Sequence, residues 1–191
     1  YDCDNLKSVD LSNLSLTAIK VETFYNCDNL ETVSLPQSVV AIEARAFENS
    51  QKLENIDLSQ LKLTTLEESA FYGCKMIAKV DLSKSSVTTI GSAAFMNNNI
   101  STLKLSDTVT TIGNSAFSGC SSFSDITIPA SVTSIGNNAF DGCVNLNKVV
   151  FENGSEPLDL GYGGEGKVDL LNSRLLCEGL FRDCPVETLY M

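Results

Sequence analysis

One phrase repeats along the whole chain, and a phenylalanine is its most regular element. The intervals between successive copies are 23, 24, 24, 22 and 23 residues, for Phe24, Phe47, Phe71, Phe95, Phe117 and Phe140. An apolar residue stands five positions before each Phe, a Cys or small polar residue three positions after it, and Leu-x-x-Val-x-Leu follows. An internal period of this length predicts a solenoid, in which each coil of the chain contacts only its neighbours.

Two apolar columns predict how the coils stack. The first column contains Val33, Ile56, Val80, Leu103, Ile126 and Val149, and the second contains Leu35, Leu58, Leu82, Leu105, Ile128 and Phe151. Because the columns are two residues apart, both point to one face of a short strand. We therefore expect a single right-handed leucine-rich solenoid, an α/β repeat fold dominated by β structure. Its parallel sheet should form the concave face, with short turns or helical turns on the convex side.

The regular phrase does not cover the whole chain. Regular repeats occupy residues 1–151, an irregular glycine-containing segment occupies 152–175, and a partial final repeat occupies 176–191. Residue 1 already lies inside a repeat, because Tyr1–Leu11 aligns with Tyr25–Leu35. Natural repeat arrays cover their ends with capping units. We therefore expect the chain to be a piece of a longer protein.

The segment Ser131-Val-Thr-Ser-Ile-Gly-Asn-Asn-Ala-Phe-Asp-Gly-Cys143 is specific enough to indicate a family. It resembles the BspA-type leucine-rich repeats of surface and secreted proteins from gut and oral bacteria and some parasitic protists. The resemblance implies a curved, mainly parallel β solenoid. It also implies an extracellular or cell-surface location, and adhesion to host or matrix proteins. Ser50 and Asn98 depart from the pattern, because they stand where the repeat otherwise has Cys.

The charge of the chain disfavours two classes of partner. The 24 acidic and 13 basic residues give a net charge of −11 that is spread along the sequence. Such a field repels phosphate backbones and anionic membranes, so we expect no nucleic-acid partner. No apolar run approaches the roughly 18 residues of a transmembrane helix, so no membrane insertion is expected in this segment.

The cysteines allow three interpretations. Six of the seven occupy the repeat position three after the aromatic column: Cys3, Cys27, Cys74, Cys120, Cys143 and Cys184. Disulfides between stacked copies, such as Cys120 and Cys143, are one alternative, but parallel side chains do not point at each other. A zinc site is another, but the chain has no C-x-x-C pair and no histidine. We favour buried reduced thiols.

Two further motifs have both a functional and a structural interpretation. Asp57 and Asp81, expected about 5 Å apart on adjacent strands, could hold calcium, but calcium needs six or more oxygen ligands. Gly161–Lys167 has the spacing of a phosphate-binding loop, but Val168 stands where the magnesium-binding Ser or Thr belongs. We favour solvated acids and a flexible surface loop. Since histidine is also absent, we predict no catalytic, cofactor or metal site and no enzyme.

The outward strand positions form the predicted partner-binding surface, which we call the ribbon. It contains Asp10, Thr32, Ser34, Asn55, Asp57, Lys79, Asp81, Thr102, Lys104, Asp125, Thr127 and Lys148. The ribbon is polar and has no aromatic side chain, which favours an extended protein or peptide partner over a sugar. Tyr162 in the glycine-containing segment is a second candidate.

We therefore expect a monomeric, non-enzymatic module that binds a protein, such as one of the host or matrix, at or outside the cell surface. The first alternative is a structural spacer that displays another domain of a larger surface protein. The second is an accessory region of an enzyme whose chemistry resides elsewhere in the polypeptide. An enzyme within these residues would require a cluster of perturbed carboxylates in a deep pocket.

Overall fold

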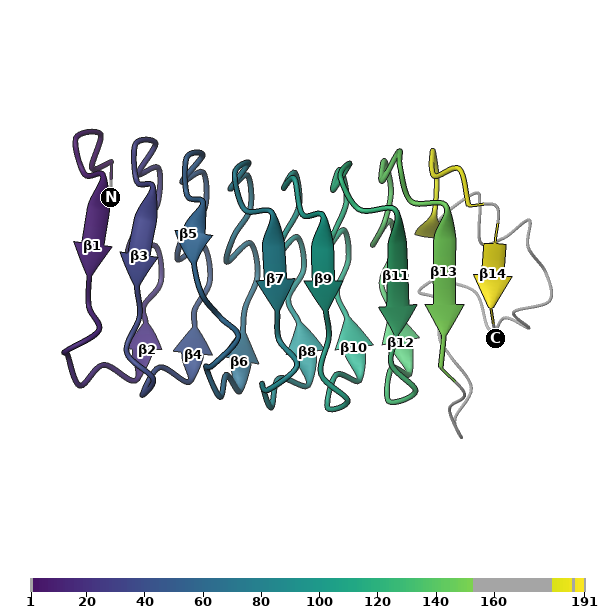
Figure 1. The fold of residues 1–191 in the computed structure, drawn as a ribbon, viewed down its shortest axis with the longest axis horizontal. Coiled ribbons are helices and arrows are strands. Elements are labelled where there is room, and N and C mark those ends of the chain that lie inside the picture. Colours follow the sequence, from purple (N-terminus) through teal and green to yellow (C-terminus); the bar gives the residue numbers. More distant parts are fainter. Residues whose placement is uncertain (1, 153–179, 187, 191) are drawn as a thin grey trace.

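The computed structural model describes residues 2–152, 180–186 and 188–190, which form an elongated stack of coils (Figure 1). Each regular coil has one strand on a front face and one on a back face. The front strands are β1 (Ser8–Asp10), β3 (Thr32–Ser34), β5 (Asn55–Ile56), β7 (Lys79–Asp81), β9 (Thr102–Lys104), β11 (Asp125–Ile128), β13 (Lys148–Phe151) and β14 (Thr188–Tyr190). The back strands are β2 (Ala18–Ile19), β4 (Ala41–Ile42), β6 (Thr65–Leu66), β8 (Thr89–Ile90), β10 (Thr111–Ile112) and β12 (Ser134–Ile135).

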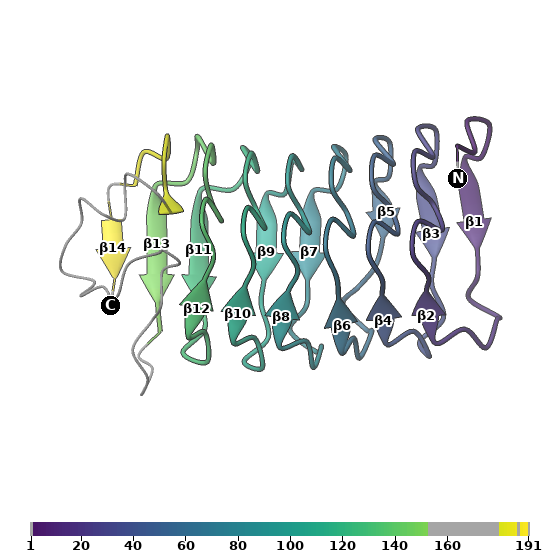
Figure 2. The ribbon, with the colours of Figure 1, turned by 180° about the vertical axis from the view of Figure 1, so that it is seen from behind.

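Every strand pairing is parallel and keeps the repeat in register. Val9 pairs with Val33, which pairs with Ile56, so the predicted apolar column is confirmed there. The back strands form a continuous six-stranded sheet, seen from behind in Figure 2. Its inward residues are the apolar residues five before each Phe, such as Ile112 and Ile135. The sequence therefore predicted the front strands, but not the second sheet.

The prediction of an α/β fold with helical turns was wrong for the described residues, which contain no α-helix. The turn around each Phe has two residues in the left-handed region. One lies two before the Phe, as in Arg45 (φ 58°), and the other two after it, as in Asn49 (φ 59°). Because a right-handed helix needs consecutive residues of negative φ, this spacing prevents one.

The repeated phenylalanines form one continuous stack through the solenoid. Successive rings from Phe24 to Phe140, and then Phe181, lie 5.0–5.6 Å apart between centroids, with interplanar angles of 2–18°. An alanine precedes five of these rings, Phe47, Phe71, Phe95, Phe117 and Phe140. It is fully buried, and its carbonyl accepts the Phe N–H of the preceding coil, as in Phe47 N to Ala70 O at 2.8 Å. Burial of each ring contributes roughly 1.5–3 kcal/mol. The stack therefore holds the coils in line.

The cysteine column donates hydrogen bonds to the same turns. The acceptor in each case is the carbonyl oxygen of the Phe in the preceding coil. The donors and distances are Ser50 (2.7 Å), Cys74 (3.0 Å), Asn98 (2.8 Å), Cys120 (3.0 Å), Cys143 (3.2 Å) and Cys184 (3.0 Å). Cys, Ser and Asn can therefore replace one another at this position, because each supplies a hydrogen-bond donor to a buried carbonyl that would otherwise lack one.

Reduced thiols are confirmed for the described cysteines, and burial for four of them. Cys27, Cys74, Cys120 and Cys143 are buried, and no disulfide joins any of the cysteines in the described ranges. Cys3 is exposed and Cys184 is half-buried, contrary to prediction. Both lie in the outermost coils that the structure describes, where fewer neighbours cover them. Cys177 lies outside the described residues.

Candidate functional site

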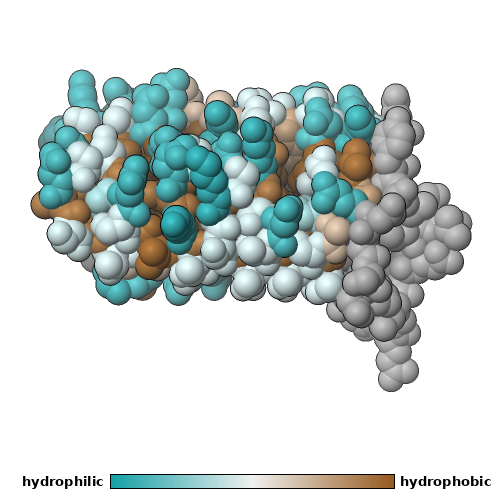
Figure 3. Space-filling view, turned by 60° about the horizontal axis from the view of Figure 1, so that its bottom comes forward, coloured by the Kyte–Doolittle hydropathy of each residue, from teal (hydrophilic) through white to brown (hydrophobic). Residues whose placement is uncertain are grey.

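The strand register assembles the predicted ribbon on the front face. Asp10 lies beside Ser34, Thr32 beside Asn55, Lys79 beside Thr102, Asp81 beside Lys104, and Asp125 beside Lys148. All twelve ribbon residues are exposed except Thr32 and Asp81, which are half-buried. Hydrophilic side chains cover much of the N-terminal half of the molecule in Figure 3, with smaller apolar areas between them.

The front sheet is interrupted, whereas the back sheet is not. Its strands form three groups, β1-β3-β5, β7-β9 and β11-β13-β14, so β5 is not paired with β7 and β9 is not paired with β11. Figure 1 shows a wider interval between the front strands at both places. On the back face at the first joint, β6 and β8 are paired only through Leu66 and Ile90. The joint between the β5 and β7 coils therefore has fewer strand pairings on both faces than a regular joint has.

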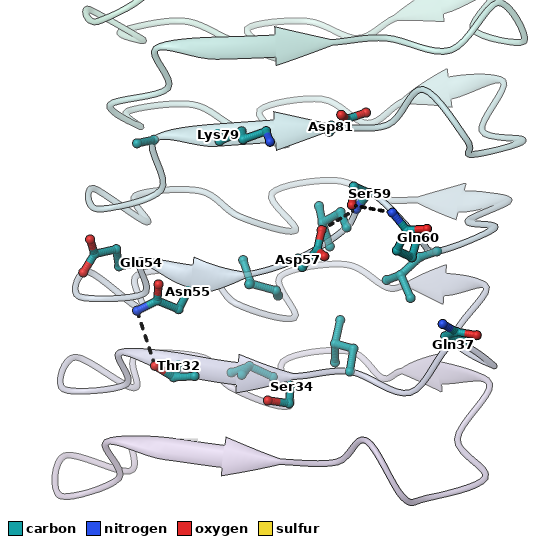
Figure 4. A pocket seen from close by; sticks show the side chains of 16 residues that line it. Thr32, Ser34, Gln37, Glu54, Asn55, Asp57, Ser59, Gln60, Lys79 and Asp81 are labelled. Carbon is teal, nitrogen blue, oxygen red and sulfur yellow. Dashed lines mark hydrogen bonds between the residues drawn. The ribbon is translucent and has the colours of Figure 1, made fainter.

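A hollow of about 710 Å³ lies on the front face over the β5 coil, and residues of the β3 and β7 coils line it on either side. Four of its lining residues carry charge: Glu54, Asp57, Lys79 and Asp81. Figure 4 shows that Glu54 and Asp57 come from the β5 coil, whereas Lys79 and Asp81 come from β7. Ile56, Leu58 and Leu61 also line the hollow and are 9%, 5% and 2% exposed. The hollow is therefore a polar groove with apolar side chains buried beneath it.

Three aspartates of the ribbon also stabilise turns. The Oδ1 atom of Asp57 accepts the N–H of Ser59 at 2.8 Å, and the Oδ1 atom of Asp81 accepts the N–H of Ser83 at 3.1 Å. Asp10 makes the same bond to Ser12 at 3.0 Å. We did not predict these bonds from the sequence. The recurring sequence Asp-Leu-Ser, which is typical of Asx turns, is the signal that indicates them.

Hydrogen bonding keeps the hollow negatively charged. The pKa of Asp57 is lowered, first by hydrogen bonding to Ser59 and then by the nearby Lys79. The pKa of Asp81 is lowered, first by hydrogen bonding to Ser83 and also by Lys104 and Lys79. Lys104 Nζ lies 3.7 Å from Asp81 Oδ2, and the Lys104 side chain is 59% exposed. Both carboxylates are therefore ionised at neutral pH.

The calcium hypothesis finds no support in the described part of the chain. The expected distance of about 5 Å between Asp57 and Asp81 depended on pairing of adjacent strands, and β5 is not paired with β7. No group of three or more Asp, Glu, Cys or His side chains suited to a metal ion occurs in the described ranges. Tyr162 and the loop 161–167 lie outside the residues that the structure describes.

A comparison with protein families identifies the repeat. The model of the BspA type leucine rich repeat region matches residues 1–122 and 88–159, with six copies. The chain belongs to this family. The predicted resemblance is therefore confirmed, and the stacked Phe rings and the Cys, Ser and Asn donors are features of this chain's BspA-type repeats.

Three solved structures resemble this BspA-type solenoid. A leucine rich cell surface protein from Faecalibacterium prausnitzii A2-165 has a TM-score of 0.69 and 30% identity, over 78% of this chain and 40% of that protein. The chain thus spans less than half of that relative's length. A Leucine Rich Repeat protein from T. pallidum (TM-score 0.61, 22% identity, 91% and 83% coverage) and one from Bacteroides ovatus ATCC 8483 (0.50, 20%, 78% and 50%) share the fold.

Two further findings bear on the assignment. No curated protein matches the BspA-type chain significantly, so no named activity is transferred to it. Among the described residues, none forms a helix with the length and apolar character needed to cross a membrane.

Proposed function

We propose that this chain is a non-enzymatic protein-binding module at the cell surface or outside the cell, and that it binds its partner along the ribbon. The hollow at the β5–β7 joint is the observation that carries the proposal. It lies at one of the two interruptions of the front sheet and exposes polar side chains from neighbouring coils. Leucine-rich solenoids present such extended surfaces to protein partners. The cell-surface description of the F. prausnitzii protein supports the location.

The proposal is tested by capture of purified extracellular-matrix proteins on a sensor surface. Asp57→Asn, Asp81→Asn and Lys104→Gln together remove charge but leave an amide oxygen to accept the two turn hydrogen bonds. We expect this triple variant to lose capture at least tenfold while its melting temperature stays near that of the parent. Asp107→Asn, an exposed carboxylate outside the hollow, is the matched control. Unchanged capture by the triple variant would exclude the ribbon as the site.

A structural spacer is the second candidate function. The Phe stack and the continuous back sheet support it, because both run through the coils without interruption and would resist bending. If the parent chain captures none of the matrix proteins, the result favours the spacer over the binding module.

A further inference from the structure

We propose that the hollow over the β5 coil, where the edge of β5 toward β7 is unpaired, binds an extended, lysine- or arginine-rich peptide segment as an added strand. The inference rests on the proposed binding function of the ribbon, and it specifies the place and chemistry of the partner. Unpaired strand edges, the sign of the charge and the shape of the hollow support it independently.

The first observation concerns backbone groups that are paired at the joints where two front strands pair. Asn55 N donates to Glu31 O at 3.0 Å, and Thr102 N donates to Ala78 O at 3.1 Å. The equivalent bond at the β5–β7 joint would join Lys79 N to Glu54 O. The structure has no such bond between these described residues, and β5 and β7 share no ladder. Unpaired strand edges of this kind are templates for an added peptide strand.

The second observation is the charge around the hollow. Glu54, Asp57 and Asp81 contribute three negative charges, and Lys79 contributes one positive charge, which leaves a net charge of −2. The net charge of −11 of the whole chain has the same sign. Opposite charge speeds association and excludes partners of the wrong sign. The hollow therefore selects a cationic segment over an acidic one.

The third observation is the layering of the hollow. Ile56 and Leu58 lie buried beneath it, whereas Glu54, Asn55 and Asp57 are exposed. An extended peptide places alternate side chains on opposite sides. Small apolar residues of the peptide would face Ile56 and Leu58, and the long side chains of Lys or Arg would reach the carboxylates. An alternating basic and small apolar sequence is thus the expected ligand.

The probe is a fluorescent peptide of alternating Lys and Val, measured by anisotropy at low salt beside a matched peptide of alternating Glu and Val. We expect the parent chain to bind the cationic peptide at least tenfold more tightly. Glu54→Gln, Asp57→Asn and Asp81→Asn together should weaken binding at least tenfold. Asp125→Asn, on the same ribbon but outside the hollow, should change it by less than twofold.

A second variant tests the space without changing any charge. Ala78 is exposed and lines the hollow, so Ala78→Tyr should fill it and reduce binding at least tenfold. Asn147→Tyr is the matched control, because Asn147 holds the same repeat position before β13. Circular dichroism confirms that each variant is folded.

The two proposals fail in different ways. No binding of the cationic peptide, equal binding of the acidic peptide, or full binding by Ala78→Tyr would overturn the strand-addition proposal. Matrix-protein capture that persists in Ala78→Tyr but is lost on neutralising Asp57, Asp81 and Lys104 would overturn it while leaving the ribbon function intact. Loss of both capture and peptide binding in Ala78→Tyr supports both.

Discussion

The Sγ of Cys120 donates a hydrogen bond to the carbonyl oxygen of Phe95 in the preceding coil, at 3.0 Å. Both residues are fully buried. This contact joins the two most regular columns of the sequence, because the donor column satisfies the carbonyls of the Phe column. A buried carbonyl without a donor is costly. The repeat therefore requires a hydrogen-bond donor at this position more than it requires cysteine.

Removing one donor from this column should destabilise the solenoid. Ser50→Ala deletes the hydroxyl that bonds Phe24 O at 2.7 Å in a fully buried site, and we expect a loss of about 1–3 kcal/mol in unfolding free energy. Ser50→Cys restores the donor of the other coils and should lose less. Urea unfolding measures both. Equal losses for the two variants would show that the donor is not what the position requires.

The buried thiols should be unreactive in the folded protein and should make it sensitive to alkaline pH. Burial raises the pKa of Cys120 from 9.0 to about 12, and burial also raises the pKa of Cys74. Above pH 9 the folded state therefore keeps thiol protons that the unfolded state loses. This contribution to stability is complete below pH 9 and is lost as pH rises toward 12.

Thermal unfolding between pH 7 and 11 measures this effect. The parent should lose stability above about pH 9 more steeply than a Cys74→Ser, Cys120→Ser double variant, because serine does not ionise there. A thiol reagent at pH 8 should label Cys120 only after unfolding. Rapid labelling of Cys120 in the native protein would contradict the burial.

Asp81 should stabilise the turn after β7 as well as carry charge. Asp81→Ala removes the acceptor of the Ser83 N–H and Oγ–H bonds, and we expect a loss of about 0.5–1.5 kcal/mol. Asp81→Asn should lose less, because its amide oxygen still accepts. Since the pKa of Asp81 is lowered on folding, its contribution is present above pH 3.8 and is lost as pH falls further. Chemical unfolding at pH 7 and pH 3 tests both statements, and an Asp81→Ala variant as stable as the parent at pH 7 would refute them.

The backbone packing around Gly113 should tolerate no side chain. A Cβ there would lie 2.7 Å from Ser92 N and 2.8 Å from Gly91 C, so we expect Gly113→Ala to cost about 1–3 kcal/mol. Ser115, two residues later, has φ 54°, and Ser115→Gly should leave stability unchanged or raise it. Thermal melts of the two variants compare them. A stable Gly113→Ala would show that adjacent coils can separate there.

The sequence predicted the features that repeat and missed those that distinguish one coil from another. Period-two spacing placed Val33 and Leu35 on one front strand, and β3 contains Val33 but ends before Leu35. The Phe interval predicted the stacking of the coils. The left-handed turns could be read in part, because Asn49 and Gly73 are residue types that adopt positive φ. Arg45 adopts it too, and nothing in its residue type predicts that.

The interruption of the front sheet left no sequence signal. Ile56 and Val80 have the same apolar character as their counterparts in paired strands, yet β5 and β7 do not pair. The composition of the ribbon was therefore predictable, whereas the hollow within it was not.

Hydrogen–deuterium exchange with a bound matrix protein tests the central claim, that the front ribbon at the β5–β7 joint is the binding surface. We predict protection of segments 54–60 and 78–82, with back-strand segments 64–67 and 88–91 exchanging as in the unbound protein. Protection of the back strands without the front strands would contradict the claim.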